Sequence, residues 1–459
     1  MSEPAPPSLL RTEIGATLRL AAPLALANLL QMAVYASDVI FVARLGQDAL
    51  AASSLAVSIF MLINWGLLGL TGAAAPLIAA ELGRKQHSVR EVRRTMRMAL
   101  WLSLLCAVVG MVVCQFGLTV MLATGQDPKI SAMAQEFLTI MSLALPFMIM
   151  SNVLRTFVST MGRPIFATMI TALAIGVNVL GNFALVFGNF GFPALGLPGS
   201  ALSSLVTAIV TMIAYIVVIQ TDRRMRRCYI WGRLWRPEWK RLKTMVRLGI
   251  PIALTIMAEG GLFGSAAYLM GNIGAAELAA HTIALQIAAA FFQIPYGIGQ
   301  AATIRIGYHY GAGDRQGVAR AGIAVFSVCL IAQVLAVAAM VGAPRLIISA
   351  YVDPDLPQNA AVVAFALQFL VIAAAFQLAD GIQTVASGAL RGLQDTKWPM
   401  IIALSGYWLV GFVVAAWLGL WTPLAGIGVW IGLMAGLVVV AILLTWRWWL
   451  REALGLVRT

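Results

Sequence analysis

The chain has 459 residues, of which 61% are apolar and 11% charged, and its 31 Lys and Arg against 18 Asp and Glu give a formal net charge of +13. Soluble globular proteins average about 45–50% apolar and about 25% charged residues. The composition therefore excludes an ordinary cytosolic enzyme and a nucleic-acid-binding protein. The basic excess needs another explanation.

Long apolar blocks dominate the chain, and each is at least as long as the roughly 20 residues with which a helix crosses a bilayer. They are too long for transmembrane β-strands, which alternate over about ten residues. The sequence thus predicts an all-α integral membrane protein with twelve transmembrane helices. The expected spans are 18–42, 50–80, 97–120, 130–154, 165–188, 199–220, 247–271, 278–304, 320–342, 360–388, 398–420 and 425–446.

The connections between these blocks explain the basic excess, because Lys and Arg concentrate in cytoplasmic loops. If residue 1 is cytoplasmic, only Arg44, Lys129 and Arg345 of the 31 basic residues fall on the other side. We therefore expect an even number of spans and both termini in the cytoplasm. We expect no cleavable leader, since the start of the chain is Pro-rich and weakly charged. The richest cytoplasmic connections contain Arg84, Lys85, Arg90, Arg93, Arg94 and Arg97, then Arg223, Arg224, Arg226, Arg227, Arg233, Arg236, Lys240, Arg241, Lys243 and Arg247.

The chain repeats itself at an offset of 228 residues. Residues 19–26 match residues 247–254 without a gap, including the prolines, and Gly69 meets Gly297 in the same register. Each half contains six expected spans, so the second half enters the membrane from the same side as the first. Parallel repeats of this kind predict two six-helix bundles related by a pseudo-two-fold axis along the membrane normal.

The repeat also predicts the domain organisation. We expect an N-terminal bundle over 1–220, a basic cytoplasmic linker over 221–246 and a C-terminal bundle over 247–459. The linker is expected to contact anionic lipid head groups. Nucleic-acid binding is not expected, because the positive-inside rule alone produces such a loop.

Three carboxylates fall well inside expected spans: Asp38, Glu259 and Asp380. An ionised group at mid-bilayer costs roughly 2.5–3.5 kcal/mol, and the sequence offers no Lys or Arg inside the spans to pair with them. At the repeat offset Asp38 falls on Ala266 and Glu259 on Gln31, neither of which is acidic. Since the scaffold is doubled and the carboxylates are not, a functional role is favoured over a protonated, hydrogen-bonded helix contact.

Asn178 and Asn182 are four residues apart and share one helix face. Their amide oxygens join Asp38 as candidates for binding a cation or a proton network. For polar residues inside spans, an interhelical hydrogen bond is the structural alternative. That alternative weighs most for the further candidates for a substrate cavity, which are Gln31, Tyr35, Gln286 and Gln377.

The remaining reactive residues indicate neither a cofactor nor an enzyme. His87, His281 and His309 are too scattered for a metal site, and no Cys/His spacing suggests zinc. No P-loop is present, which argues against direct ATP hydrolysis. No nucleophile stands near a matching base in the sequence.

Taken together, these motifs resemble the multidrug and toxic compound extrusion (MATE) family, and specifically its NorM-like branch. The resemblance covers nearly the whole chain and rests on Arg-Leu-x-x-Pro opening each half, Ala-Ala-His at 279–281, Ile-Arg-Ile-Gly at 304–307 and Leu-Arg-Gly-Leu-Gln-Asp at 390–395. It implies export of organic cations and other drugs by antiport with Na⁺ or H⁺, through alternating access. It further implies a monomer in the bacterial cytoplasmic (inner) membrane.

The resemblance also implies roles for individual residues. Asp38 matches the acid of the family's first helix, and Asn178 and Asn182 match its partners in the fifth span. Glu259 and Asp380 match the C-terminal acids of the NorM-like branch. These five residues are the expected ion- or proton-coupling sites, with Na⁺ expected at Glu259 and Asp380 or at Asp38. Buried carboxyl groups suit either ion, because burial favours their neutral form.

Three rival functions stay open. A lipid-linked oligosaccharide flippase of the same superfamily would share the architecture, but a diphosphate cargo requires cations in the cavity, whereas the buried charges expected here are all acidic. An integral-membrane enzyme would need a catalytic constellation at the membrane surface, and the short connections offer none. A passive channel would show flux without a coupling gradient.

Overall fold

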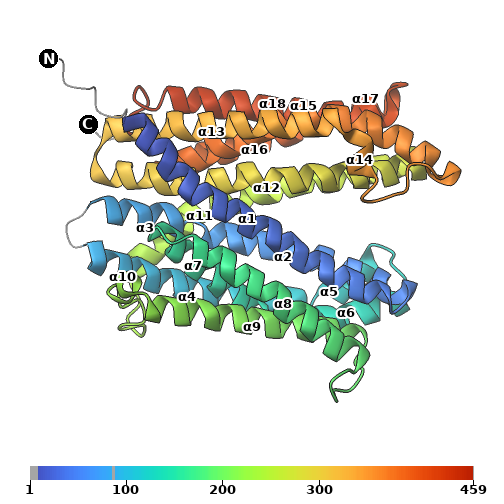
Figure 1. Cartoon of the computed structure of the whole chain (residues 1–459), viewed down its shortest axis with the longest axis horizontal. Coiled ribbons are helices and arrows are strands. Elements are labelled where there is room, and N and C mark those ends of the chain that lie inside the picture. Colours follow the sequence, from blue (N-terminus) through green and yellow to red (C-terminus); the bar gives the residue numbers. More distant parts are fainter. Residues whose placement is uncertain (1–8, 85–87, 458–459) are drawn as a thin grey trace. The chain divides into compact units, whose positions relative to one another are not determined.

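The computed structural model describes residues 9–84 and 88–457, which form helices and connecting turns without any β-strand. Lys85 and His87 lie outside the described residues. The helices of the first half are α1 (Leu9–Ala43), α2 (Gln47–Thr71), α3 (Ala74–Gly83), α4 (Ser88–Cys114), α5 (Gly117–Ala123), α6 (Pro128–Ser142), α7 (Leu145–Thr160), α8 (Ile165–Phe187), α9 (Leu197–Thr221) and α10 (Arg223–Arg226) (Figure 1).

The second half has the same architecture with longer uninterrupted helices. A π-helical segment interrupts the eleventh expected span, and a short 3₁₀ turn precedes the tenth. These elements are α11 (Trp239–Ile273), α12 (Ala275–Ala312), α13 (Arg315–Gly342), α14 (Pro344–Ile348), η1 (Pro357–Asn359), α15 (Ala360–Gly392), α16 (Lys397–Leu404), η2 (Ser405–Phe412), α17 (Val413–Trp421) and α18 (Ala425–Trp449).

The helices confirm the predicted membrane architecture. Within the described residues, eleven helical segments are long and apolar enough to cross a membrane. A twelfth is formed by α6 and α7 together, which are bent by 46° at the short break between them. This bent pair corresponds to the expected span 130–154. The all-α class and the twelve spans therefore agree with the sequence.

The chain divides into two compact units whose boundaries fall inside helices. One unit contains the chain up to Ala25 and from Leu254 onward, and the other contains Leu26–Ala253. The two boundaries are separated by the same 228 residues as the repeat, and each follows a proline by two residues, Pro23 in α1 and Pro251 in α11. Each of these helices thus begins in one unit and ends in the other.

The parts of α1 up to Ala25 and of α11 up to Ala253 are called the crossing segments, because each belongs to a different unit from the rest of its helix. Close backbone contacts hold both crossing segments at equivalent positions. In the unit of residues 26–253, a Cβ on Gly69 of α2 would lie 2.6 Å from Cα of Ala253 in α11. In the other unit, a Cβ on Gly297 of α12 would lie 2.7 Å from the backbone nitrogen of Ala25 in α1. Both contacts require glycine, because no side chain fits at these distances. The glycine pair that reveals the repeat in the sequence is therefore explained by helix packing.

The core of the unit that contains the chain from Leu254 onward surrounds Trp430. Helices α12, α13, α15 and α18 run lengthwise beside one another, with α15 contacting the other three (Figure 1). The buried ring of Trp430 packs against Phe369, Phe376 and His281, with ring centroids 5.5–6.3 Å apart. His281 is buried and neither of its ring nitrogens has a hydrogen-bond partner among the described residues.

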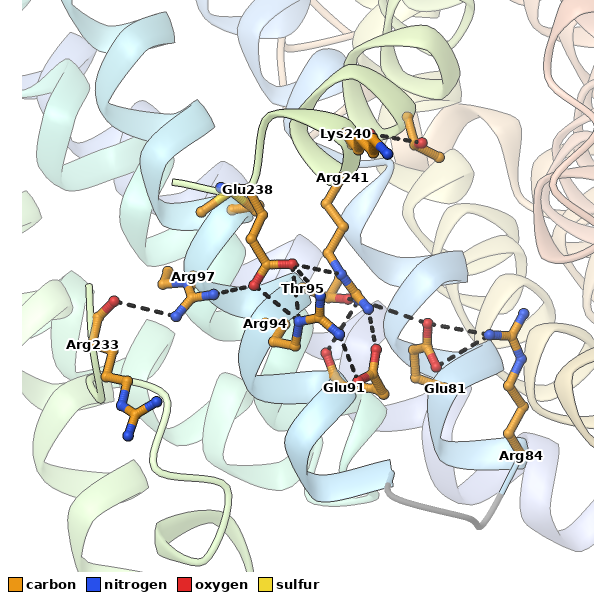
Figure 2. Close-up of polar contacts among 12 residues, drawn as sticks. Glu81, Arg84, Glu91, Arg94, Thr95, Arg97, Arg233, Glu238, Lys240 and Arg241 are labelled. Atoms are coloured by element: carbon orange, nitrogen blue, oxygen red, sulfur yellow. Dashed lines mark hydrogen bonds and ion pairs between the residues drawn. The ribbon is translucent and has the colours of Figure 1, made fainter. Parts of the chain in front are cut away.

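The end of the basic linker is held against α4 by a network of ion pairs (Figure 2). Glu238, directly before α11, pairs with Arg94 at 2.6 Å and also with Arg97. Arg241, in the first turn of α11, pairs with Glu91 and lies 3.4 Å from Glu238. Hydrogen bonding and ion pairing with Arg94 hold the pKa of Glu238 below its usual value.

The same network reaches the backbone of the linker. Arg97 donates to the carbonyl oxygen of Arg233 at 3.2 Å, and the indole of Trp101 donates to that of Leu234 at 2.7 Å. Much of the remaining linker is exposed, including Trp235 and most of its arginines. The linker is thus anchored at its C-terminal end while its basic side chains face outward.

Candidate ion and substrate sites

Asp38 of α1 lies at the centre of a hydrogen-bond network in the unit of residues 26–253. Its Oδ1 accepts from the amide groups of Asn178 at 2.9 Å and Asn182 at 2.7 Å, both on α8. Its Oδ2 accepts from the hydroxyl group of Ser204 on α9 at 3.0 Å. Three donors thus converge on one carboxylate, which stabilises its ionised form.

The two asparagines are positioned by helix periodicity and burial. Asn178 and Asn182 are fully buried, and the amide of Asn182 also donates to Oδ1 of Asn178 at 3.2 Å. The backbone oxygen of Asn178 accepts from Ser203 at 3.1 Å, which ties α8 to α9. Oδ1 of Asn182 has no partner among the described residues. A buried oxygen without a donor, close to a carboxylate, is suited to a cation.

A cavity of about 160 Å³ opens beside this network, enclosed by α1, α2, α6, α7, α8 and α9. Its walls combine apolar side chains with amide, hydroxyl and charged groups, as is typical of small-molecule sites. Two of the expected cavity residues, Gln31 and Tyr35, are among them. The lining residues are Gln31, Val34, Tyr35, Asp38, Asn64, Leu68, Met141, Met148, Ser151, Asn152, Arg155, Thr171, Ala174, Asn178, Ser204, Thr207, Ala208, Thr211 and Tyr215.

The other two expected cavity residues lie in the unit that contains the chain from Leu254 onward. Gln286 of α12 is exposed. Gln377 of α15 is fully buried, and its side-chain amide has no partner among the described residues. Its backbone oxygen accepts from the side chain of Gln333 on α13. Gln377 therefore lies in the helix core, one turn from Asp380.

Glu259 and Asp380 are joined by one glutamine side chain. The amide of Gln383 donates to Oε1 of Glu259 at 2.9 Å and to Oδ1 of Asp380 at 3.1 Å. Asp380 is buried, whereas Glu259 is half-buried. The structure thus brings the two C-terminal acids of α11 and α15 into one cluster, as the sequence suggested, through a residue that the sequence reasoning had passed over.

The π-helical segment η2 supplies the fourth member of this cluster. Tyr407 lies within η2, is fully buried and donates its hydroxyl proton to Oε1 of Gln383 at 2.8 Å. π-Helical turns recur at functional sites, because the extra residue redirects side chains. Here the segment aims a phenol at Gln383. The amide of Gln383 is thereby oriented, with its oxygen on Tyr407 and its nitrogen on the acids.

Sequence reasoning missed four residues of these clusters: Ser204, Gln383, Tyr407 and Arg155. Gln383 carried a usable signal, since it follows Asp380 by three residues and shares its helix face. Ser204 and Tyr407 belong to types that are common in membrane helices, so their sequence positions gave no signal. No group of three or more potential metal-ligating residues of the Asp, Glu, His and Cys types forms within the described ranges.

Arg155 corrects one expectation, that the buried charges of the cavity are all acidic. It lies on α7 just beyond the end of the expected fourth span, where it counted as one of the cytoplasmic cations. In the structure its side chain lines the same cavity as Asp38 and donates to Oδ1 of Asn28 at 2.5 Å. Helix α7 continues to Thr160, beyond the end of the expected span. The cavity therefore contains charges of both signs.

Comparison with known proteins identifies the family. The sequence model of the MatE family matches residues 23–184 and 251–417. A protein of Mesorhizobium japonicum, named "Probable multidrug resistance protein NorM", is 44% identical over 453 residues, covering 98% of this chain and 97% of its own. The "Multidrug resistance protein NorM" of Burkholderia vietnamiensis is 36% identical over 451 residues, covering 98% and 96%.

Solved structures show the same fold at lower sequence identity. A eukaryotic MATE transporter superposes with a TM-score of 0.85 at 20% identity, covering 96% of each chain. A MOP superfamily transporter from Pyrococcus furiosus superposes with a TM-score of 0.86 at 21% identity, covering 100% of each chain. The matched residues of the family model begin at the proline of each opening segment, Pro23 and Pro251, and include the carboxylates Asp38, Glu259 and Asp380. The chain therefore belongs to the MatE family and is a multi-pass membrane protein of the NorM-like branch.

Proposed function

We propose that the protein is a secondary active multidrug efflux transporter that exports organic cations and other drugs in exchange for Na⁺ or H⁺ by alternating access. The names of its relatives, which are multidrug resistance proteins, support the transport of drugs. The distribution of basic residues supports an orientation with both termini in the cytoplasm. The relatives are bacterial, which supports the cytoplasmic (inner) membrane as the location.

The observation that carries the proposal is the arrangement around Asp38. Among the described residues, this carboxylate has three neutral donors and no permanent counter-ion within hydrogen-bonding distance, and it lies beside a cavity of about 160 Å³. It can hold a proton, or it can hold Na⁺ once the amides of Asn178 and Asn182 turn their oxygens inward. A cationic drug competes for the same charge. Exclusive binding of ion or drug to one carboxylate is the elementary requirement of antiport.

The cluster of Glu259, Asp380, Gln383 and Tyr407 is proposed as the second coupling site. Two carboxyl groups joined by one amide favour sharing a proton or a cation over two adjacent negative charges. Gln383 donates to both acids, so gain or loss of a proton or cation at one carboxyl group alters the hydrogen bonding of the other. Carboxylate, amide and phenol oxygens are suitable ligands for Na⁺ as well as for protons.

The energetics are adequate for coupled export. One elementary charge that crosses 100 mV releases about 2.3 kcal/mol. A tenfold concentration gradient costs about 1.4 kcal/mol. For a neutral or zwitterionic drug, one coupling ion per turnover therefore supports accumulation of more than tenfold. Exchange of one ion for one monocationic drug moves no net charge, so there the concentration gradient of the ion, or a second ion, supplies the energy. No bound nucleotide or resident cofactor is required by the proposal.

The decisive experiment is ethidium efflux from proteoliposomes, driven first by a Na⁺ gradient alone and then by a pH gradient alone. One gradient should drive efflux, and Asp38→Asn, Glu259→Gln and Asp380→Asn should each uncouple it. Asp353→Asn, in an exposed loop, is the matched control and should leave efflux unchanged. If neither gradient drives efflux, antiport is wrong. If the C-terminal pair of variants retains full coupling, the second site is wrong.

The proposed partners besides drugs are anionic lipids at the cytoplasmic face. The exposed arginines of the linker lie beside exposed aromatic side chains, including Tyr229, Trp235 and Trp239. Aromatic and basic residues together are typical of the membrane interface. Thermal unfolding in nanodiscs with and without phosphatidylglycerol tests this contact. The protein should unfold at a higher temperature with the anionic lipid.

A further inference from the structure

The cavity in the unit of residues 26–253 contains one cation that the ion-exchange scheme does not use. Arg155 of α7 lines it together with Asp38 of α1. Arginine side chains near the ends of membrane helices commonly extend toward the lipid head groups. Arg155 instead reaches α1 and donates one hydrogen bond to Oδ1 of Asn28. Its guanidinium is thus part of the cavity wall.

Arg155 also differs from nearby arginines in its partners. Arg94 and Arg241 pair with glutamates. Arg163, in the turn between α7 and α8, lies 3.6 Å from Asp222. Arg155 forms no ion pair with any carboxylate in the described part of the chain; its hydrogen-bond partner there is the neutral side-chain amide of Asn28. A guanidinium has five N–H donors. Most of its donor capacity is therefore unused by protein groups.

Charge and shape together indicate what the site would bind. A cation in a membrane cavity is costly unless it is paired or faces water, and a guanidinium is best matched by a planar carboxylate, which it can contact through two hydrogen bonds. The neighbouring walls include Leu68, Val34 and Met148, which favour an organic ligand over a small hydrated anion. A cavity of about 150 Å³ accommodates a benzene ring, so this one has room for a carboxyphenyl group.

The two charges lie at different levels of the cavity. Asn28, which holds Arg155, precedes Asp38 by ten residues on α1, a rise of about 15 Å. Within the described residues, no ion pair joins Arg155 to Asp38, whose hydrogen-bond partners are Asn178, Asn182 and Ser204. The cavity is therefore bipolar, with a carboxylate at one level and a guanidinium at another.

We propose that Arg155 is an anion subsite of the drug cavity, which binds the carboxylate of amphoteric organic compounds whose basic nitrogen is attracted to Asp38. This inference deepens the proposed function and rests on it for the cavity's role in drug binding. Arg155 determines specificity: it selects among substrates and takes no part in ion coupling.

Rhodamine 110 and rhodamine 123 form a matched pair of probes, because the second is the methyl ester of the first and lacks the free carboxylate. Binding of each dye to the purified full-length protein is measured by fluorescence polarisation, without an ion gradient. Arg155→Gln should weaken rhodamine 110 binding about tenfold, or about 1.4 kcal/mol, and change rhodamine 123 binding less than twofold. Arg155→Lys should weaken rhodamine 110 by a smaller factor, because it keeps the charge and loses the bidentate contact.

Arg163→Gln is the matched control, since it removes the same charge from an exposed side chain outside the cavity. It should leave both dyes unaffected. Equal effects of Arg155→Gln on the two dyes, or no effect on either, would overturn the subsite. If Arg155→Gln does not fold, the selective loss of rhodamine 110 in Arg155→Lys decides the question in the same way.

The wild-type protein separates this inference from the proposed function. Binding of rhodamine 123 without binding of rhodamine 110 would reject the anion subsite and leave drug binding intact. Binding of neither dye would reject both. Because the measurement uses no gradient, a failure of antiport in proteoliposomes would not alter its outcome.

Discussion

Glu13 and Arg241 occupy equivalent positions of the two repeats, 228 residues apart, and carry opposite charges. Glu13 of α1 accepts two hydrogen bonds from Arg305, at 2.7 and 2.6 Å, and lies 3.4 Å from His309. Arg241 of α11 lies 3.8 Å from Glu81, whose repeat equivalent is His309. The same contact is thus kept in both units with its polarity inverted. Each crossing segment matches only its own partner helix, because the wrong pairing would place like charges together.

Arg241 should contribute measurably to stability. Arg241→Gln removes one of the two arginine partners of Glu91, which keeps only Arg94, and also removes one partner of Glu238. We expect a loss of about 1–2 kcal/mol, because the network is partly exposed and screened. Lys243→Gln is the control, since Lys243 lies exposed on the same helix. Thermal unfolding in detergent measures both variants, and equal effects of the two would contradict the prediction.

The contribution of Glu238 should depend on pH in the acid range. Its pKa in the folded chain lies below the ordinary value of 4.5 because Arg94 hydrogen-bonds to it and, with Arg97, favours the ionised form. The stabilisation is therefore fully present above about pH 4.5 and is lost as the pH falls through the lower folded-state pKa. The difference in unfolding temperature between the wild type and Glu238→Gln should be constant near neutrality and shrink below pH 4.5.

Glu452→Gln serves as the control for this titration. Its side chain is 60% exposed, and its carboxylate lies 3.9 Å from Arg451. This substitution should change the unfolding temperature little at any pH in the range. A wild-type advantage over Glu238→Gln that persists unchanged to the lowest pH would show that the carboxylate charge is not the cause.

The paired glycines should be intolerant of side chains. Gly69→Val and Gly297→Val place a Cβ within 3 Å of backbone atoms of Ala253 and Ala25. Overpacking of this kind costs about 1–3 kcal/mol, and backbone atoms cannot move aside as a side chain does. Both variants should unfold at lower temperature and lose efflux activity.

Gly176→Val and Gly264→Val are matched controls for the two glycines. A Cβ at either control position meets no other atom within 4 Å. Both controls should retain stability, since valine is at least as compatible with a helix as glycine. Equal destabilisation at all four positions would indicate a general intolerance of valine.

Loss of the Gln383 side chain should lower stability and transport by more than the loss of a single buried hydrogen bond. Gln383→Leu removes the link between Glu259 and Asp380 and also the acceptor of Tyr407. Each buried group left without a partner costs about 1–3 kcal/mol. We expect a lower unfolding temperature and at least tenfold slower gradient-driven efflux. Tyr407→Phe removes one bond and leaves the link intact, so it should have a smaller effect; a larger one would contradict the role given to Gln383.

The sequence predicted features that depend on periodicity and on charge. The twelve spans follow from apolar length, and Asn178 and Asn182 share a helix face with the four-residue spacing that any α-helix imposes. That both amides meet Asp38, 140 and 144 residues away in sequence, follows from helix packing. The sequence indicated this contact only indirectly, because polar side chains are scarce in the spans and the few present are expected to contact one another.

The residues that escaped prediction are those whose role depends on local departures from ideal helices. Tyr407 reaches Gln383 from a π-helical segment that no pattern in the sequence announces. Arg155 lies just beyond an expected boundary, on a helix that continues to Thr160, and its side chain lines the cavity. Conversely, Gln286 fitted the polar pattern of a cavity residue and is exposed. The domain boundaries expected from the repeat stay a prediction.

The passage of α1 and α11 between units has a consequence for fragment complementation. A chain cut within 221–246 would yield two pieces, neither of which contains all residues of a compact unit. The first piece would lack the segment of α11 up to Ala253, and the second would lack the segment of α1 up to Ala25. Each piece would have to pack against the missing helical segment supplied by the other piece, as in domain-swapped protomers. Separately expressed halves should therefore be unstable alone and recover on co-expression.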